Sequence, residues 1–145
     1  MSAASNYLEN KLLDHALRVT PYNAASFTTS TTLYVALFVN TSGNAATNLE
    51  SGVLTDEVST SGGTLYARRA IAFSAASGGT SSTNATITFD TAGANWGSIT
   101  HVAVMDGATA GAGNVLYWGA ASIAKTIQTG DTFSISAGNL TVSLA

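Results

Sequence analysis

The sequence predicts a mainly β protein: an antiparallel β-sandwich of about eight or nine strands, preceded by one N-terminal amphipathic helix. Two observations support this. After the single proline, the apolar period changes from about four residues to two, and short β-branched and aromatic runs alternate with clusters of Gly, Ser, Asn and Asp. Helical patterns are missing between these runs, which favours antiparallel sheets over a parallel α/β sheet. A closed barrel is the alternative.

The length of 145 residues fits a single domain that can bury a core without disulfides or a structural metal. We expect an N-terminal arm at 1–5, a helix at 7–18 and a sandwich over 31–145. The chain has no cysteine, so a thiol nucleophile and thiolate metal sites are excluded. Only 9% of residues are charged, and the net charge is -3 with five basic residues. This argues against nucleic acid and against an anionic membrane surface as partners.

The helix predicted at 7–18 has start signals and an apolar face. Asn6 is suited to act as N-cap, with Glu9 three residues later to close a capping box. Leu8, Leu12, Ala16 and Leu17 recur at helical spacing on one side. The pattern ends before the proline, which disfavours helical geometry in the residue preceding it.

Residues 33–39 are apolar on both faces, which indicates a central strand covered on one side by the opposing sheet. The helix or a partner chain would cover the other side. The segment 41–63 is rich in Asn, Ser, Gly and Thr, and we expect a mobile or partner-contacting loop there. Further strands are predicted at 52–58, 65–73, 85–89, 98–106, 114–120, 122–127, 132–136 and 140–144.

Catalytic chemistry has weak support. His101 lies near Asp106 and Asp90 in sequence, but no serine has the glycine pattern of a nucleophile elbow, so a buried or interface histidine is the better interpretation. Asp56 and Glu57 are adjacent, and neighbours on an extended segment point in opposite directions. We therefore predict no catalytic residue, no cofactor and no metal.

Aromatic and basic residues give two further candidates. Trp96 and Trp118 would form either packed aromatic groups or a stacking surface for a sugar, and Trp96 is placed to pack over a sheet end. Arg68 and Arg69 on one strand must point to opposite faces. One of them therefore faces a subunit interface or pairs with a carboxylate.

Short motifs spread over nearly the whole chain give a resemblance to a known group. They are Asn6–Asn10, Leu12–His15, Leu33–Phe38, Tyr66–Arg69, Trp96–His101, Leu116–Ala120 and Gly130–Phe133. In this order they resemble small structural proteins of tailed bacteriophages, described as capsid cement (decoration) proteins or as tail fibre proteins. The segment 41–63 follows the pattern least. The resemblance carries over no catalytic residue.

The resemblance implies a non-enzymatic virion protein, with a capsid cement protein as the leading interpretation. Such a protein would assemble in the host cytoplasm, sit on the capsid surface as a homo-oligomer and stabilise the shell by binding the major capsid protein. The alternative is a tail fibre or host-recognition module that binds a glycan. Packing of the helix on its own sheet competes with a role in contacts, and 140–144 could pair with a neighbour by strand addition. The candidate interface residues are Ser2, Ala3, Ser5, Tyr7, Leu8, Leu12, Arg68 and Arg69.

Overall fold

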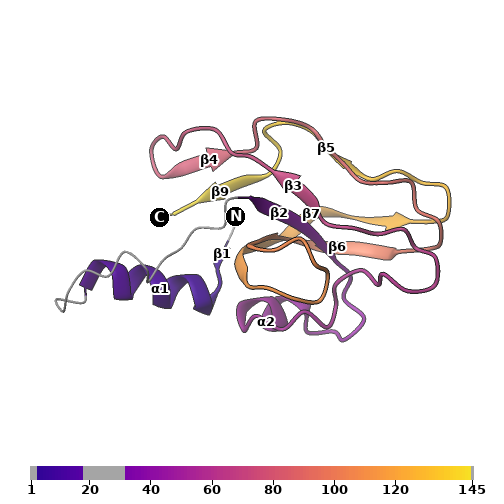
Figure 1. Cartoon of the computed structure of the whole chain (residues 1–145), viewed down its shortest axis with the longest axis horizontal. Coiled ribbons are helices and arrows are strands. Elements are labelled where there is room, and N and C mark those ends of the chain that lie inside the picture. Colours follow the sequence, from indigo (N-terminus) through magenta and orange to yellow (C-terminus); the bar gives the residue numbers. More distant parts are fainter. Residues whose placement is uncertain (1–2, 18–31, 145) are drawn as a thin grey trace.

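The computed structural model describes residues 3–17 and 32–144 (Figure 1). Within these ranges the chain forms two helices and nine strands, and every strand pair is antiparallel. In chain order the elements are β1 (Ala3–Ala4), α1 (Asn6–Leu17), β2 (Leu33–Phe38), α2 (Ala45–Glu50), β3 (Arg69–Ile71), β4 (Thr80–Ser82), β5 (Ile87–Thr88), β6 (Gly97–Met105), β7 (Val115–Ile127), β8 (Ser134–Ile135) and β9 (Thr141–Ser143).

The first layer is a five-stranded sheet in the order β1-β7-β6-β2-β3. Its centre is the pairing of β2 with β6, from Tyr34 opposite Met105 to Phe38 opposite His101. The longest strand, β7, pairs with β6 on one side and with the two residues of β1 on the other. The sheet therefore brings the N-terminus beside the C-terminal half of the chain (Figure 1).

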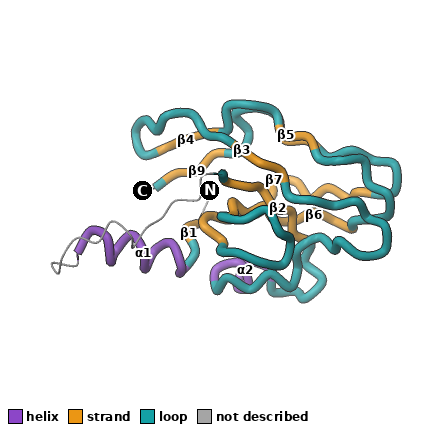
Figure 2. Tube along the Cα trace, viewed as in Figure 1, coloured by secondary structure: helices purple, strands orange, loops and turns teal. Residues whose placement is uncertain are grey.

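The second layer is a ribbon in which residues 80–92 run antiparallel to 130–144. It contains the two-stranded sheets β4-β9 and β5-β8. The chain enters this layer directly from β3, since Phe73 bridges to Thr83 just beyond that strand. Gly78 and Gly79, both with positive φ, form the tight turn before β4. The two layers form an open sandwich (Figure 2), which confirms the predicted fold class against the barrel alternative.

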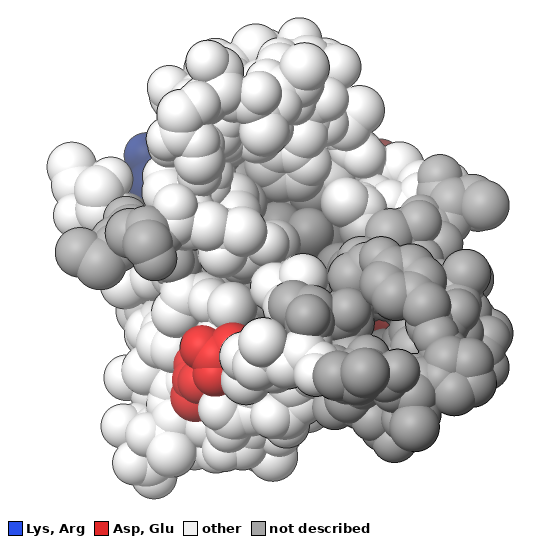
Figure 3. Space-filling model, turned by 90° about the vertical axis from the view of Figure 1, so that its left-hand side faces the viewer, with Lys and Arg blue, Asp and Glu red and all other residues white. Residues whose placement is uncertain are grey.

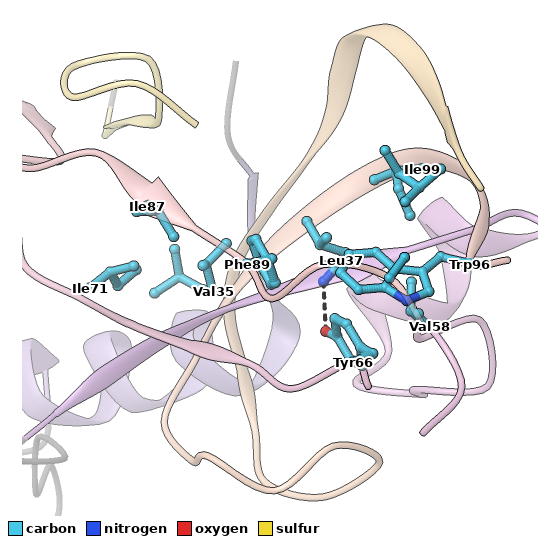
Figure 4. Close-up of a cluster of buried hydrophobic side chains, with 12 residues drawn as sticks. Val35, Leu37, Val58, Tyr66, Ile71, Ile87, Phe89, Trp96 and Ile99 are labelled. Atoms are coloured by element: carbon cyan, nitrogen blue, oxygen red, sulfur yellow. Dashed lines mark hydrogen bonds between the residues drawn. The ribbon is translucent and has the colours of Figure 1, made fainter. Parts of the chain in front are cut away.

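The main core lies between the two layers. At its centre the Tyr66 ring stacks on Phe89 with centroids 6.1 Å apart and meets Trp96 edge-on at 5.5 Å (Figure 4). The Tyr66 hydroxyl also accepts a hydrogen bond from the Leu37 amide at 3.0 Å. The aromatic cluster thus ties the loop before β3 to the central strand. The other buried members are Val35, Val58, Ile71, Ile87, Ala92, Ile99, Val104 and Ile127.

A smaller core on the outer face of the first layer explains why β2 is apolar throughout. Ala36 and Phe38 point to this side and pack with Met105 of β6 and Leu49 of α2. Val35 and Leu37 point into the main core, and these four of the six side chains of β2 are fully buried. The prediction of a strand buried on both faces is therefore confirmed.

The cover on this outer face is α2, which corrects the prediction of one helix and a loop over 41–63. The helix has only six residues, too few to show an amphipathic period, and its cap residue Asn44 makes no side-chain capping hydrogen bond. The helix is anchored at its start and near its end, since the side chains of Ala45 and Leu49 are buried.

The other element boundaries differ from prediction where strands are short or bulged. The two strands expected at 114–120 and 122–127 are one strand, β7, and the strand expected at 65–73 is reduced to the three residues of β3. The strand expected at 52–58 is reduced to a bridge between Glu57 and Phe38. The very short strands β1 and β4 were not predicted, because two or three residues carry too little alternation.

Candidate interface at the N-terminal strand and helix

The N-terminal arm adds a strand to the free side of β7. Ala3 lies opposite Trp118 and Ala4 opposite Tyr117. The ladder continues through the Ser5 amide, which donates to the Leu116 carbonyl at 3.0 Å. The described part of the arm is therefore held by its own chain, while the Ala3 side chain stays exposed. Of the predicted interface residues, Ser2 lies outside the described residues.

Ser5 is the hinge between this strand and the helix. Its buried hydroxyl donates to the Val115 carbonyl and also accepts the Leu8 amide at 3.4 Å, while its carbonyl accepts the Glu9 amide at 2.9 Å. Ser5 is thus the N-cap, and the predicted cap at Asn6 is wrong by one residue. The Ser5 hydroxyl caps α1 and also binds the Val115 carbonyl at the start of β7. Its contact with β7 therefore fixes the direction of α1.

Helix α1 packs on the sandwich mainly through its first turn. Leu8 is 2% exposed and Leu12 is partly buried, so one alternative raised by the sequence, packing on its own sheet, holds here. Tyr7 lies at the edge of the contact between α1 and the sandwich and is partly exposed. The Lys11 ammonium lies 5.9 Å from the centroid of the Tyr7 ring. Beyond this turn the helix extends past the sandwich (Figure 1).

Two leucines of α1 have large exposed side chains: Leu13, which the sequence argument did not single out, and Leu17, which it placed on the same side as Leu8 and Leu12. Leu13 is 56% exposed and Leu17 is 70% exposed. They are four residues apart and therefore lie on one face. The spacing of Leu13 and Leu17 was a usable signal, but the sequence argument assigned Leu17 to the series of Leu8 and Leu12 instead. This pair, with the margin residue Tyr7, is the apolar surface that the N-terminal element presents outward.

Arg68 and Arg69 are both paired with carboxylates of their own chain. The fully buried guanidinium of Arg68 binds both oxygens of Glu57, at 2.7 and 2.8 Å, and donates to the Gly107 and Ala112 carbonyls. It therefore joins the strand region near β3 to the loop between β6 and β7. Arg69 forms an ion pair with Asp90 at the surface. These pairs match the carboxylate alternative, and an interface role for either arginine stays a prediction.

A second polar centre holds the segment that carries α2. Asp56 is 2% exposed, and its carboxylate accepts hydrogen bonds from Thr41 (3.2 Å), the Ser42 amide (2.9 Å) and Asn48 (3.2 Å). Burial alone would raise the pKa of Asp56, but these hydrogen bonds, led by those of Ser42, hold the pKa below its ordinary value. An ionised Asp56 thus fixes both ends of the α2 segment.

The residues considered for catalysis are engaged elsewhere. Asp106 accepts the amide and side-chain nitrogens of Asn114, both at 2.7 Å, and Asp90 pairs with Arg69. His101 lies beside Thr100 and the Trp118 ring. Burial lowers the pKa of His101, with Asp56 opposing the shift.

The indole nitrogen of each tryptophan is hydrogen-bonded within the chain. Trp96 is 5% exposed, and its indole nitrogen donates to the Thr64 carbonyl at 2.8 Å. Trp118 is partly buried, and its indole nitrogen donates to Glu50 at the end of α2, also at 2.8 Å. The structure uses Trp96 in the core and Trp118 to tie α2 to the sheet.

The surface is weakly charged. Figure 3 shows one end of the molecule, where most of the described atoms belong to uncharged residues. Among the helices of the described ranges, none has the length and apolar character needed to span a membrane.

Comparison with known families gives one result that covers nearly all of the chain. The model of the family described as "Gp80: Podophage GP4 fiber I protein gp80" matches residues 3–143. No curated protein matches the sequence. The matched range contains both the sandwich and the N-terminal strand and helix.

Proposed function

The chain belongs to the family of the podophage GP4 fiber I protein gp80, and from this membership we propose that it is a non-enzymatic fibre protein of the phage virion. In this proposal the sandwich is the rigid body of the fibre subunit. The N-terminal strand and helix attach it to neighbouring virion subunits. The suspected relation to tailed-phage structural proteins is thereby confirmed at the level of the family.

The observation that carries the attachment proposal is the exposed pair Leu13 and Leu17, at 56% and 70% exposure. Burying two leucine side chains stabilises a contact by roughly 1.5–3 kcal/mol each. The helix that carries them is held in direction by Ser5 and Leu8, so the pair is presented without a large ordering cost. An anchored first turn and two exposed leucines further along the helix are what a docking element requires.

A non-enzymatic role is supported by the hydrogen bonds that occupy three carboxylates of the chain. The carboxylates of Asp56, Glu57 and Asp106 all accept hydrogen bonds that stabilise loops. Each therefore has a structural use that accounts for its burial. A substrate would have to displace one of these partners to reach the group.

A capsid cement protein is the second candidate, and the uncharged Ser- and Thr-rich surface favours it. Such a surface gives little charge repulsion between many copies on a lattice. In this case the same helix face would bind the major capsid protein on the capsid surface, after assembly in the host cytoplasm. Repeated binding to the assembled lattice would stabilise the shell by linkage.

The copy number of the chain in purified virions separates the two candidates. Quantitative mass spectrometry would compare this chain with the major capsid protein in the same particles. A few copies per particle are expected for a fibre, whereas a simple lattice fraction of the capsid protein would replace the fibre proposal with the cement proposal. Absence from particles would contradict both.

A further inference from the structure

Residues 40–55, which contain α2, form a loop that is closed at its base and is called the α2 loop below. The Val39 amide donates to the Asp56 carbonyl at 2.9 Å, so the two ends of the loop lie side by side. Within the described ranges, the backbone hydrogen bonds of the loop stay inside it or join Leu54 to Glu57, and none reaches a sheet strand. Surface loops with close ends and internal contacts behave as local units.

Side-chain hydrogen bonds of the loop converge on the carboxylate of Asp56. Thr41, the Ser42 amide and Asn48 donate to it at 3.2, 2.9 and 3.2 Å. These donors lie before and within α2. One acceptor group at the base therefore holds the shape of the loop.

The α2 loop has few contacts with the first layer. Leu49 is fully buried and packs with Phe38 and Met105. The indole nitrogen of Trp118 donates to the Glu50 carboxylate at 2.8 Å, and within the described residues this is the single hydrogen bond between the loop and the first layer. A helix of six residues is not stable alone, so its position depends on these contacts and on the base of the loop.

The face beneath the loop is apolar. Ala36 and Phe38 of β2, with Ala103 and Met105 of β6, are each at most 1% exposed. The helix α2 lies against the outside of these strands (Figure 1). The pairing of β2 with β6 and the main core on their other side do not involve the loop. Opening of the loop would therefore expose an apolar face and leave both intact.

Acid weakens the group that holds the loop. Burial acts to raise the pKa of Asp56, but its hydrogen bonds, led by those of Ser42, hold the pKa below the ordinary value. Asp56 therefore stabilises the docked loop fully above its unfolded pKa, and this contribution is lost as the pH falls through the folded pKa.

His101 of β6 acts in the same direction. It is paired with Phe38 and so lies on the face that the loop covers. Burial lowers the pKa of His101, with the charge of Asp56 opposing the shift. Because the buried state favours the neutral ring, acid favours a state in which His101 is less buried.

Two other carboxylates lie near the loop in sequence. Glu50, at the end of α2, accepts the hydrogen bond of Trp118 that joins the loop to β7. Glu57, directly after the base, binds Arg68 in the buried ion pair and so belongs to the contacts of the sandwich. Within the described residues, the acid-sensitive contacts of the loop are therefore those of Asp56, His101 and Glu50.

We propose that the α2 loop is a flap that acid releases: it opens as one unit while the sandwich stays folded, and it exposes the outer apolar face of β2 and β6. The inference goes beyond the proposed function and holds for a fibre and a cement protein alike, because every contact that carries it lies within one chain. The chain thereby has an apolar surface that is covered at neutral pH and uncovered in acid.

Hydrogen exchange of the purified full chain tests this inference, with rates measured by mass spectrometry and corrected for the intrinsic effect of pH. The protection of the amides at 43–53 should fall about tenfold or more between neutral pH and about pH 3. The amides of β2 and β6 should keep their protection. Binding of the apolar dye ANS should rise as the loop opens, since this dye reports exposed apolar surface.

Asp56→Asn keeps the size of the side chain and removes its charge. It should lower the protection of the loop about tenfold or more already at neutral pH, and acid should then have a smaller effect than in wild type. Asp90→Asn removes a carboxylate of the second layer and is the matched control, in which the loop should exchange as in wild type. If Asp56→Asn does not fold, Glu50→Ala replaces it and should lower loop protection about threefold or more, because it removes the acceptor of the Trp118 bond.

Two kinds of result would overturn the inference. In the first, the loop and the strands β2 and β6 lose protection together in acid, which would mean that the loop opens only when the whole chain unfolds. In the second, loop protection stays unchanged in acid, or stays unchanged in a folded Asp56→Asn or Glu50→Ala variant.

Discussion

The central strand β2 and the helix α1 are both rich in apolar residues, yet the structure treats them in opposite ways. Val35, Leu37 and Phe38 of β2 are fully buried between two cores, whereas Leu13 and Leu17 of α1 are more than half exposed. The comparison teaches that the apolar residues that stabilise the fold and the apolar residues that stay exposed lie in different parts of the chain. The sandwich is stabilised from both faces of β2, whereas α1 keeps two leucine side chains exposed, which is the basis of the proposed attachment.

The polar contacts also differ between the two regions. Around β2, the bidentate Arg68–Glu57 pair and the Asp56 carboxylate are buried and hold several loops each. At α1, one serine hydroxyl and one buried leucine hold the helix. Changes near β2 should therefore alter global stability most, and changes on the outer half of α1 should alter it least.

The largest effect is expected from Arg68→Ala. It leaves the Glu57 carboxylate buried without its cation, which costs about 3–5 kcal/mol of unfolding free energy. Arg69→Ala is the matched control, because its ion pair with Asp90 is partly exposed and should be worth about 1 kcal/mol or less. Urea unfolding measures both. Equal losses of unfolding free energy in the two variants would contradict the claim that the buried contacts near β2 stabilise the fold most.

A smaller but pH-dependent effect is expected from Asp56→Ala. Thr41 and Ser42 lie at the surface and can turn to water once the carboxylate is removed, so the whole loss should be about 1–3 kcal/mol of unfolding free energy. Because the folded pKa of Asp56 lies below its unfolded value, its stabilisation is complete above the unfolded pKa and is lost as the pH falls through the folded pKa. Urea unfolding of wild type and variant at neutral and acidic pH should show their stabilities converging in acid. A constant difference would argue against an ionised Asp56.

The N-cap offers a finer test at the boundary between the two regions. Ser5→Ala should lower unfolding free energy by about 1 kcal/mol, because it removes the acceptor of the Leu8 amide. Asn6→Ala, at the cap position that the sequence suggested, should change it by about 0.5 kcal/mol or less. Thermal unfolding followed by circular dichroism measures the difference. The reverse order would place the cap at Asn6.

The fold class was predictable from sequence because strand alternation and turn residues are local signals. The burial of β2 on both faces was equally predictable, since residues 33–39 are apolar without alternation. The helix α2 was not, because its stability comes from Asp56 and Leu49, contacts that six residues of sequence do not indicate. Tertiary contacts therefore determine the parts that the sequence did not predict.

The sequence predicted an N-terminal arm and a helix as candidate contact elements, and an interface there stays a prediction. The structure shows that the arm forms the strand β1 and that Ser5 and Leu8 anchor the arm and helix on their own sheet. Leu17 was expected on the same side as Leu8 and Leu12, and its exposure together with that of Leu13 follows only once β7 fixes the direction of the helix. Likewise, two adjacent arginines must face opposite ways, but only the fold shows that Arg68 pairs with Glu57 inside the protein.

The most direct test of the central division is the double variant Leu13→Asp, Leu17→Asp. Its unfolding free energy should stay within about 0.5 kcal/mol of wild type, since both side chains are exposed. Its incorporation into virions, measured by quantitative mass spectrometry against wild type, should fall strongly. Normal incorporation of this folded variant would contradict the claim that α1 is the attachment element.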